Sequence, residues 1–270
     1  MKSKLKKFLA TTKLIYLYRA IKYVLMYLNP GTFFSNVGYK LRGAHDGFPN
    51  PPLYLIYLTI NQPSLFEYYR GGYITARAIK QILAKNKIEP EKFNNILELG
   101  SGAGRVLREF TEYKNSNLFG CDYNNKLVNW CRKKLYFADF YKNELNPPVK
   151  YQDRHFDFVY LISVFTHLPE ATQKLWLKEF YRIIDDNKYL LITLHGENVV
   201  QKMSDTDKKE FHEKGYFEIS VDKAGTNHFG TFHTKEHFNK LISGMFEIVD
   251  ITYGGTPNHP YQDIYLLRKI

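Results

Sequence analysis

The sequence contains very little cysteine and no long uninterrupted apolar run. Its 270 residues include two cysteines, Cys121 and Cys131, which excludes a disulfide framework. Two thiols ten positions apart with no second pair predict no zinc site, so no metal is expected. No apolar stretch reaches the roughly 18–20 residues that a membrane-spanning helix needs. Disulfide-rich secreted domains and multi-span membrane proteins are therefore excluded, and a reducing, cytoplasmic location is expected.

Acidic residues are missing from the first 45 positions, although the whole chain contains 27 of them. That segment carries nine Lys and Arg, so it holds most of the formal net charge of +11 and leaves +2 for the remaining 225 residues. Proteins that bind nucleic acid present a basic face on the folded domain. A nucleic-acid partner is therefore not favoured, and the positive charge indicates instead that the N-terminal segment contacts another surface.

Residues 1–45 are predicted to form a basic, aromatic, helical extension. The stretch 14–28 is apolar and aromatic except for two cations, and Asn29-Pro30-Gly31 is a typical helix end. The Pro- and Gly-rich stretch 29–52 is predicted to be an irregular connector. Residues 1–28 either lie on an anionic membrane surface or pack on the domain or on a second copy of the chain.

From residue 73 onward, helical and strand patterns alternate. Short apolar runs predict buried strands at 95–99 and 156–162, and helical spacing predicts an amphipathic helix at 170–184. Further helices are expected at 73–84, 105–111, 126–135 and 234–243, further strands at 118–121, 137–141, 188–194, 246–253 and 264–268, a turn at 185–187 and an inserted hairpin at 216–232. Repeated strand–helix units predict a parallel, doubly wound sheet that binds ligands at the carboxyl ends of its strands.

Three alternating glycines follow the first of these strands. The run Glu98-Leu99-Gly100-Ser101-Gly102-Ala103-Gly104-Arg105 places an acid on the strand and glycines in the turn. Glycine permits a tight turn and lets a ligand lie against the backbone, and the acid suits a cationic amine. Dinucleotide-binding turns have a third small residue where this chain has Arg105. The pattern therefore differs from a pyrophosphate-binding loop, and an ordinary strand–helix turn is the alternative.

A second acid stands at the end of the neighbouring strand. Asp122 follows the expected strand 118–121, a position from which a carboxylate accepts hydrogen bonds from both ribose hydroxyls. NAD enzymes use the same arrangement, so Asp122 indicates an adenosine-type ligand without identifying it. The alternative role for Asp122 is the N-cap of the helix that follows.

Further motifs follow in order along the chain: Phe156-Asp157-Phe158-Val159-Tyr160, Ser163-Val164-Phe165-Thr166-His167-Leu168 and Thr193-Leu194-His195-Gly196. Together with the glycine loop and Asp122, they resemble bacterial class I S-adenosylmethionine-dependent methyltransferases from about residue 95 to 196. A subset of that family also has an Asp-Gly-x-Pro-x-Pro-Pro segment, here 46–52, and a Gln-Asp pair on its last strand, here 262–263. The resemblance therefore covers about 46–270, although the usual Pro-Gly-Gly turn is Asp-Asp-Asn at 185–187.

The resemblance implies a Rossmann-like, doubly wound α/β fold. Its sheet has seven mostly parallel strands with an antiparallel last strand, and residues 46–270 form the methyltransferase domain. Residues 197–232 are the expected insertion or lid. By position, Glu98 would hold the methionine amine, Asp122 the ribose, and Asn143, with Asp139 as competitor, the adenine. The implied contacts to S-adenosyl-L-methionine are Glu98, Gly100, Ser101, Gly102, Asp122, Tyr123, Asn143 and Ser163.

Two histidines are the candidate catalytic residues, because His accepts protons near neutral pH and both follow strand ends at the cofactor edge. His167 and His195 are each expected either to deprotonate a hydroxyl acceptor or only to stabilise a loop, and an amine acceptor needs no base. His228, near the hairpin, is a further guess for the acceptor site.

The expected function is methyl transfer, at oxygen, to a small-molecule or a glycan- or lipid-linked acceptor. The alternatives are a methyltransferase that acts on RNA or protein, a binding protein that keeps the cofactor pocket without turnover, and a nicotinamide oxidoreductase. The expected location is the cytoplasm, with peripheral contact at the inner membrane surface. Acceptor contacts come from variable insertions, so the sequence does not identify the acceptor.

Overall fold

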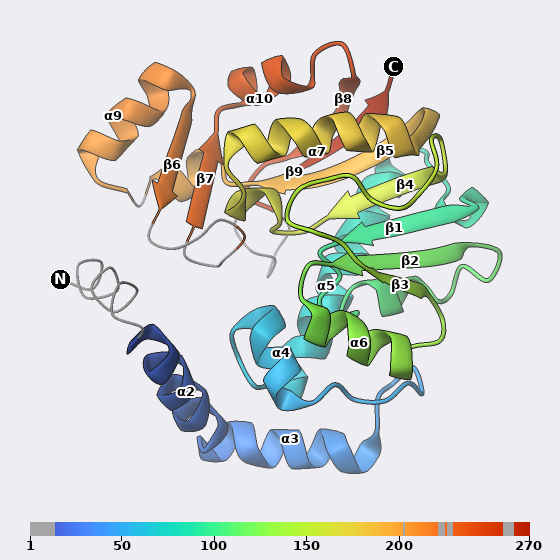
Figure 1. Ribbon diagram of the computed structural model, residues 1–270, viewed down its shortest axis with the longest axis vertical. Coiled ribbons are helices and arrows are strands. Elements are labelled where there is room, and N and C mark those ends of the chain that lie inside the picture. Colours follow the sequence, from blue (N-terminus) through green and yellow to red (C-terminus); the bar gives the residue numbers. More distant parts are fainter. Residues whose placement is uncertain (1–13, 202, 221–224, 226–228, 256–261) are drawn as a thin grey trace.

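The computed structural model describes residues 14–270 except 202, 221–224, 226–228 and 256–261 (Figure 1). Seven strands form one central sheet in the order β3-β2-β1-β4-β5-β9-β8. Their bounds are β1 Asn95–Leu99, β2 Asn117–Asp122, β3 Asp139–Lys142, β4 Phe156–Leu161, β5 Ile184–Leu194, β8 Phe246–Thr252 and β9 Asp263–Lys269. Strands β1 to β5 pair in parallel, whereas β9 runs antiparallel to both of its neighbours. The predicted Rossmann-like sheet with an antiparallel last strand is confirmed.

Both faces of the sheet are covered by helices, as alternating side chains require. Leu97 and Leu99 pack with Trp176 of α7 (Glu170–Ile183), on the face that α10 (Lys235–Ile242) also covers. Ile96 packs on the other face, in the cluster that contains residues of α5 (Leu65–Lys85) and α6 (Asn125–Lys134). Glu98 lies two residues from Ile96, so its side chain shares the face of α5.

The carboxyl ends of β1, β2 and β4 lie side by side. Strand β1 pairs with β2 on one edge and with β4 on the other, and Leu99 is level with Cys121 and with Leu161. The winding of the chain reverses at this point, and such a reversal leaves a crevice at the strand ends.

Two predictions around the sheet are wrong. The expected helix 105–111 is a single 3-10 turn, η2 (Leu107–Phe110). The N–H of Leu107, at the start of this turn, donates to Glu98 Oε2 at 3.0 Å. The turn expected at 185–187 lies inside β5, where Asn187 takes a φ of 60° and the register with β4 shifts.

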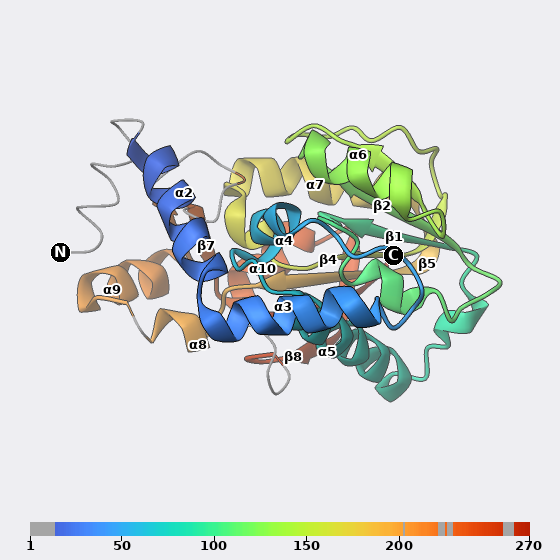
Figure 2. The same ribbon diagram turned by 90° about the horizontal axis from the view of Figure 1, so that it is seen from below.

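The N-terminal region contains more helix than predicted. After α2 (Leu14–Tyr27), the expected connector begins with a second helix, α3 (Pro30–Arg42), and α4 (Leu53–Ile60) follows. Proline suits the first turn of a helix because its missing N–H has no partner there. Asn29 caps α3 by accepting a hydrogen bond from the N–H of Thr32 at 3.2 Å. In the view from below, α3 lies along the underside of the molecule, with α2 crossing at one end (Figure 2).

The predicted helix 73–84 is the second half of α5, which begins eight residues earlier after the N-cap Ser64. Gly71 and Gly72 weaken the helical pattern there. Their lack of a side chain is required by packing, since a Cβ on Gly72 would lie 2.3 Å from the carbonyl oxygen of Arg105.

The inserted hairpin is β6 (Tyr216–Ser220) with β7 (Phe229–His233), preceded by α8 (Glu197–Val200) and α9 (Asp205–Lys214). Its inner side packs on Val200 and Phe211. A bridge between His195 and Phe232 joins the hairpin to the end of β5. Two 3-10 helices, η1 (Pro90–Lys92) and η3 (Phe165–His167), complete the chain. Within the described ranges, no helix combines the length and apolarity that crossing a membrane requires.

Candidate active site

A cavity of about 480 Å³ opens at the carboxyl ends of β1, β2 and β4. Its walls come from the glycine loop, from the residues after β2, β3 and β4, and from α4 and α5. All eight residues that the sequence assigned to the cofactor line this cavity: Glu98, Gly100, Ser101, Gly102, Asp122, Tyr123, Asn143 and Ser163. Asp139, the competing candidate for the adenine, is not among the lining residues; its carboxylate pairs with Lys150 at the surface.

Glu98 is a buried carboxyl group that faces this cavity. Its Oε2 accepts hydrogen bonds from the Leu107 N–H at 3.0 Å and from the Tyr160 hydroxyl at 3.3 Å. Burial raises the pKa of Glu98 to about 8, although the nearby Arg105 and these two hydrogen bonds oppose the increase. A positive group that entered the cavity beside Glu98 would favour its charged form.

Asp122 organises the glycine loop from the end of β2. Its Oδ2 accepts a hydrogen bond from the Gly102 N–H at 2.9 Å, and its Oδ1 accepts one from the Asn124 N–H at 2.7 Å. Burial raises the pKa of Asp122, and these two bonds limit the increase. The N-cap of α6 is Asn124, which accepts from the Lys126 N–H at 3.1 Å, so the alternative role of Asp122 as the cap is wrong.

The loop needs glycine at two positions where the backbone is left-handed and neighbours are close. Gly100 has a φ of +77°, and a Cβ there would lie 2.5 Å from Cγ2 of Val164. Gly102 has a φ of +57°, and a Cβ there would lie 2.7 Å from Cγ2 of Thr59 on α4. The loop is therefore closed on both sides, and its remaining open side is the cavity.

Three cavity-lining side chains carry buried polar atoms that have no hydrogen-bond partner among the described residues: Ser101 Oγ, Arg105 Nε and Asn143 Oδ1. Buried polar groups in folded proteins are nearly always hydrogen-bonded, because an unpaired one costs the free energy of its lost hydration. Their grouping around one cavity indicates a site for a polar ligand.

Arg105 is the largest of these three residues and was not assigned to the site from the sequence. Gly71 leaves room for its guanidinium, since a Cβ there would lie 2.7 Å from Nη1. Within the described part of the chain, no salt bridge joins Arg105 to a carboxylate. The carboxyl group that interacts electrostatically with Arg105 is that of Glu98. Burial lowers the pKa of Arg105, and the nearby Glu98 opposes the decrease. The sequence feature that could have identified Arg105 is its position, because dinucleotide-binding loops have a small residue there.

The two candidate histidines differ in their relation to the cavity. His167 lines it, and its Nδ1 is 2.8 Å from the carbonyl oxygen of Phe229, so Nδ1 carries the proton and Nε2 is left as an acceptor. His195 is not among the lining residues; its ring stacks on Phe232 at 4.9 Å, and burial lowers its pKa to about 4. His228 lies outside the described residues.

Two motifs from the ends of the predicted domain contact segments next to the site, although neither is among the lining residues. Asp46, from the 46–52 segment, forms a two-pronged ion pair with the buried guanidinium of Arg108, with one contact at 2.8 Å. Gln262 accepts a hydrogen bond from the Ser163 hydroxyl at 2.9 Å. The Gln262 amide nitrogen lies 3.5 Å from His195 Nε2. The last strand therefore supports the turn that follows β4.

A doubly wound sheet with an acid-flanked glycine loop at its switch point defines a nucleoside-cofactor enzyme of the α/β class. Residues 96–187 match the family described as "Methyltransferase domain". The chain therefore carries a methyltransferase domain of the class I, S-adenosylmethionine-dependent type, and the cofactor of that domain is S-adenosyl-L-methionine.

Solved structures with the same fold include other methyltransferases. A protein titled as SAM-dependent methyltransferases from Methanosarcina mazei is 20% identical, with a TM-score of 0.53 over 70% of this chain and 97% of that chain. An S-adenosylmethionine-dependent methyltransferase from Mesorhizobium loti is 14% identical, with a TM-score of 0.55 over 71% and 98%. The magnesium protoporphyrin IX methyltransferase of Synechocystis PCC 6803, solved with bound SAH, is 14% identical, with a TM-score of 0.53 over 76% and 86%.

Proposed function

We propose that the cavity transfers the methyl group of S-adenosyl-L-methionine to a hydroxyl of a small-molecule or a glycan- or lipid-linked acceptor. The observation that carries this proposal is the His167 ring, which lines the cofactor cavity and holds the Nδ1 proton against the Phe229 carbonyl, so that Nε2 is the acceptor nitrogen of the ring. Burial lowers the pKa of His167, so the ring is neutral at pH 7 and can take a proton.

The residues present fit the two ends of the cofactor. At the methionine end, Glu98 complements the ammonium group. Arg105, whose buried Nε has no partner among the described residues, complements the α-carboxylate. At the nucleoside end, Asp122 lies at the tip of β2 beside the ribose position, and the unpaired Asn143 Oδ1 is available to an exocyclic amine. Tyr123 and Ser163 line the same cavity between these ends and the lid.

When bound, S-adenosyl-L-methionine supplies an electrophilic methyl group on sulfur. The bound cofactor would supply the methyl group to the acceptor oxygen and leave as S-adenosylhomocysteine, and His167 Nε2 would take the hydroxyl proton of the acceptor. The protein's main task is to hold the acceptor oxygen in line with the methyl group. We assign the base role to His167 and not to His195, because His195 is outside the cavity lining.

The 197–232 insertion is the proposed lid over the acceptor side. Gly225 lines the cavity, its N–H donates to the His167 carbonyl at 2.8 Å, and its carbonyl accepts from the Tyr123 hydroxyl at 2.9 Å. Residues 46–270 are the proposed catalytic domain, since the Asp46 ion pair ties its first segment to the core. The described part of 1–28 is α2, which supports peripheral contact of a cytoplasmic enzyme with the inner membrane surface.

The proposal is tested with labelled S-adenosylmethionine and separated lipid, small-molecule, RNA and protein fractions of a lysate. We expect label in the lipid or small-molecule fraction, and a His167→Gln variant that loses about 100-fold or more in rate while it binds S-adenosylhomocysteine normally. His155→Gln is the matched control, because His155 directly precedes β4, at the opposite end of that strand from the cavity.

Three results would contradict the proposal. Label confined to RNA or protein would change the acceptor class. Full activity of His167→Gln would remove its role as base. Tight binding of S-adenosylhomocysteine with no transfer to any fraction would favour a binding protein.

A further inference from the structure

Helices α2 and α3 each expose a continuous apolar stripe. The most exposed side chains recur at helical spacing, and we call them the α2–α3 face: Leu17, Ile21, Leu25, Leu28, Phe34 and Leu41. Leu25 is 66% exposed, Phe34 71% and Leu41 84%. Large apolar side chains grouped in this way on a surface mark an interaction site, whereas single ones need no explanation.

The opposite sides of both helices are already in contact with the domain. Tyr23 of α2 packs against Tyr57 of α4, with the ring centroids 5.3 Å apart. On α3, the buried Asn36 donates to the carbonyl of Pro63 and accepts from the N–H of Leu65, each at 2.8 Å. A ring contact between Tyr27 and Phe33, at 6.2 Å, joins the two helices. The helices are therefore anchored with their apolar stripes turned outward.

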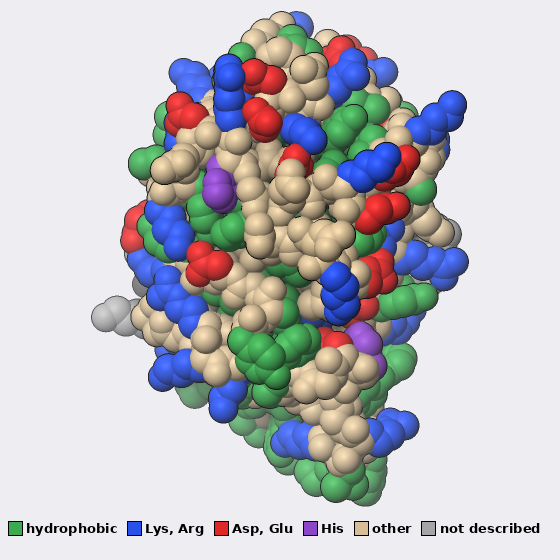
Figure 3. All heavy atoms as spheres, turned by 90° about the vertical axis from the view of Figure 1, so that its right-hand side faces the viewer, with side chains coloured by type: hydrophobic (Ala, Val, Ile, Leu, Met, Phe, Trp, Pro, Cys, Tyr) green, Lys and Arg blue, Asp and Glu red, His purple; other side chains and the backbone are tan. Residues whose placement is uncertain are grey.

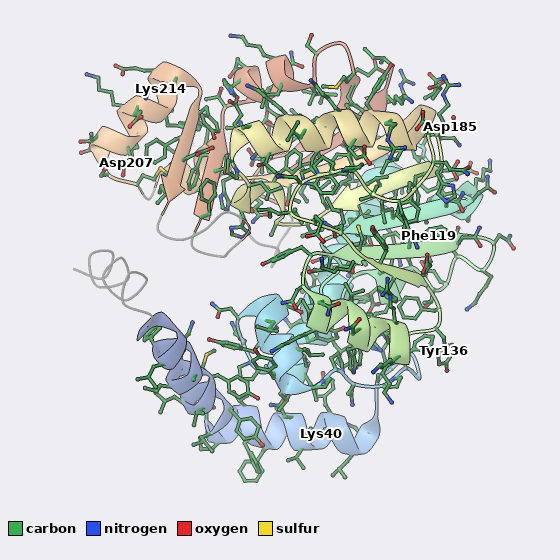
Figure 4. All side chains as sticks on the ribbon, in the orientation of Figure 1. Lys40, Phe119, Tyr136, Asp185, Asp207 and Lys214 are labelled. Atoms are coloured by element: carbon green, nitrogen blue, oxygen red, sulfur yellow. The ribbon has the colours of Figure 1, made fainter. Side chains whose placement is uncertain are left out.

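The two helices that carry this face hold charges of one sign. No acid occurs before Asp46, and Lys22, Lys40 and Arg42 lie on the two described helices. Figure 3 shows hydrophobic side chains gathered at the lower end of the molecule with Lys and Arg beside them. Figure 4 places Lys40 on α3 at that same edge, and the mixed charges Asp207 and Lys214 on α9 at the opposite end.

We infer that the α2–α3 face docks this enzyme on an anionic lipid bilayer, with its apolar side chains below the headgroups and its cations at the phosphates. Basic amphipathic helices of this kind bind in the plane of the interface and do not span it. A second copy of the chain would bring the same positive charge to the same surface, which opposes self-association. The inference concerns the described helices, includes α3, and does not depend on which acceptor the cavity takes.

Vesicle co-sedimentation of the full chain tests this surface. We expect binding to mixed phosphatidylcholine–phosphatidylglycerol vesicles, weaker binding at higher salt, and little binding to pure phosphatidylcholine vesicles. The double variant Lys40→Gln/Arg42→Gln should bind about 25-fold more weakly, about five-fold for each charge. Leu25→Glu and Leu41→Glu should each abolish sedimentation, because a charge must then enter the apolar layer.

Leu175→Glu is the matched control, since Leu175 is 47% exposed on α7, away from this face. Calorimetry with S-adenosylhomocysteine should give the same affinity for all of these variants, which separates loss of docking from loss of folding or of cofactor binding.

Two outcomes would overturn the inference. Equal binding to neutral and anionic vesicles would remove the charge argument. No vesicle binding, together with a dimer in light scattering that Leu25→Glu dissociates, would assign the face to a second copy.

Discussion

The protonation of Glu98 gives a sharp test of the cofactor site. With a pKa of about 8, the carboxyl group of the ligand-free protein carries its proton in about nine of ten molecules at pH 7. If the ligand's ammonium group lies against Glu98, binding requires the carboxylate and releases that proton. Replacing Glu98 by Gln removes the titrating group but keeps an oxygen that can accept from the Leu107 N–H.

The expected size of the effect follows from that pKa. Between pH 6.5 and pH 8.5, the free energy needed to remove the proton falls by about 2 kcal/mol, so the affinity for S-adenosylhomocysteine should rise about 25-fold. Folding shows the same linkage. The pKa of Glu98 is higher in the folded than in the unfolded state, so stability falls as pH rises from about 4.5 to about 8.

Calorimetry in two buffers with different ionisation heats measures the released protons directly. At pH 7 the wild type should release about 0.9 proton on binding, and Glu98→Gln close to none. An affinity that does not change with pH, and a heat that is the same in both buffers, would refute the reasoning. Glu98 would then be ionised in the free protein or would not meet the ligand.

Further predictions concern the loop, the N-terminal ion pair and a buried histidine. Gly100→Ala should weaken S-adenosylhomocysteine binding at least ten-fold in calorimetry, because φ is +77° and the new Cβ would lie 2.5 Å from Val164; unchanged affinity would contradict the loop geometry. Asp46→Ala should lower the free energy of unfolding in urea by about 3–5 kcal/mol, since it leaves Arg108 buried without its partner; a loss below about 1 kcal/mol would oppose this. Burial lowers the pKa of His195 to about 4, so the free energy of unfolding should fall by up to about 3 kcal/mol as the pH drops from about 6.5 to 4. In urea unfolding at these pH values, His195→Gln should not show this part of the decrease, and an identical decrease in wild type and variant would contradict the assignment.

Short-range patterns in the sequence predicted much of the sheet. The strand Asn95–Leu99 lies where its apolar run ends at glycines, and Glu98 and Asp122 line one cavity as their positions at two strand ends suggested. Such features depend on residues within one strand and one turn. A sequence pattern records them well because the side-chain period of a strand is local.

Local patterns failed where a packing contact or a helix cap outweighs the usual preference of a residue type. Residues 107–110 form a 3-10 turn whose first N–H, that of Leu107, donates to the distant Glu98 carboxyl group. A glycine is required at position 72, inside a helix, because the backbone of Arg105 approaches it too closely for a side chain. Pro30 begins a helix because Asn29 caps it, which a reading of Pro and Gly as loop residues missed.

The sequence alone therefore predicted the class of enzyme, the cofactor loop and the two acids beside it, since each is part of a short local motif at the end of a strand. Tertiary structure decided that His167 and not His195 lines the cavity, and that the guanidinium of Arg105 reaches the same space. It also decided that α3 presents its apolar side chains outward. The reason is that each of these depends on which side of a helix or loop is already covered by segments far away in the chain, and that coverage is set by packing.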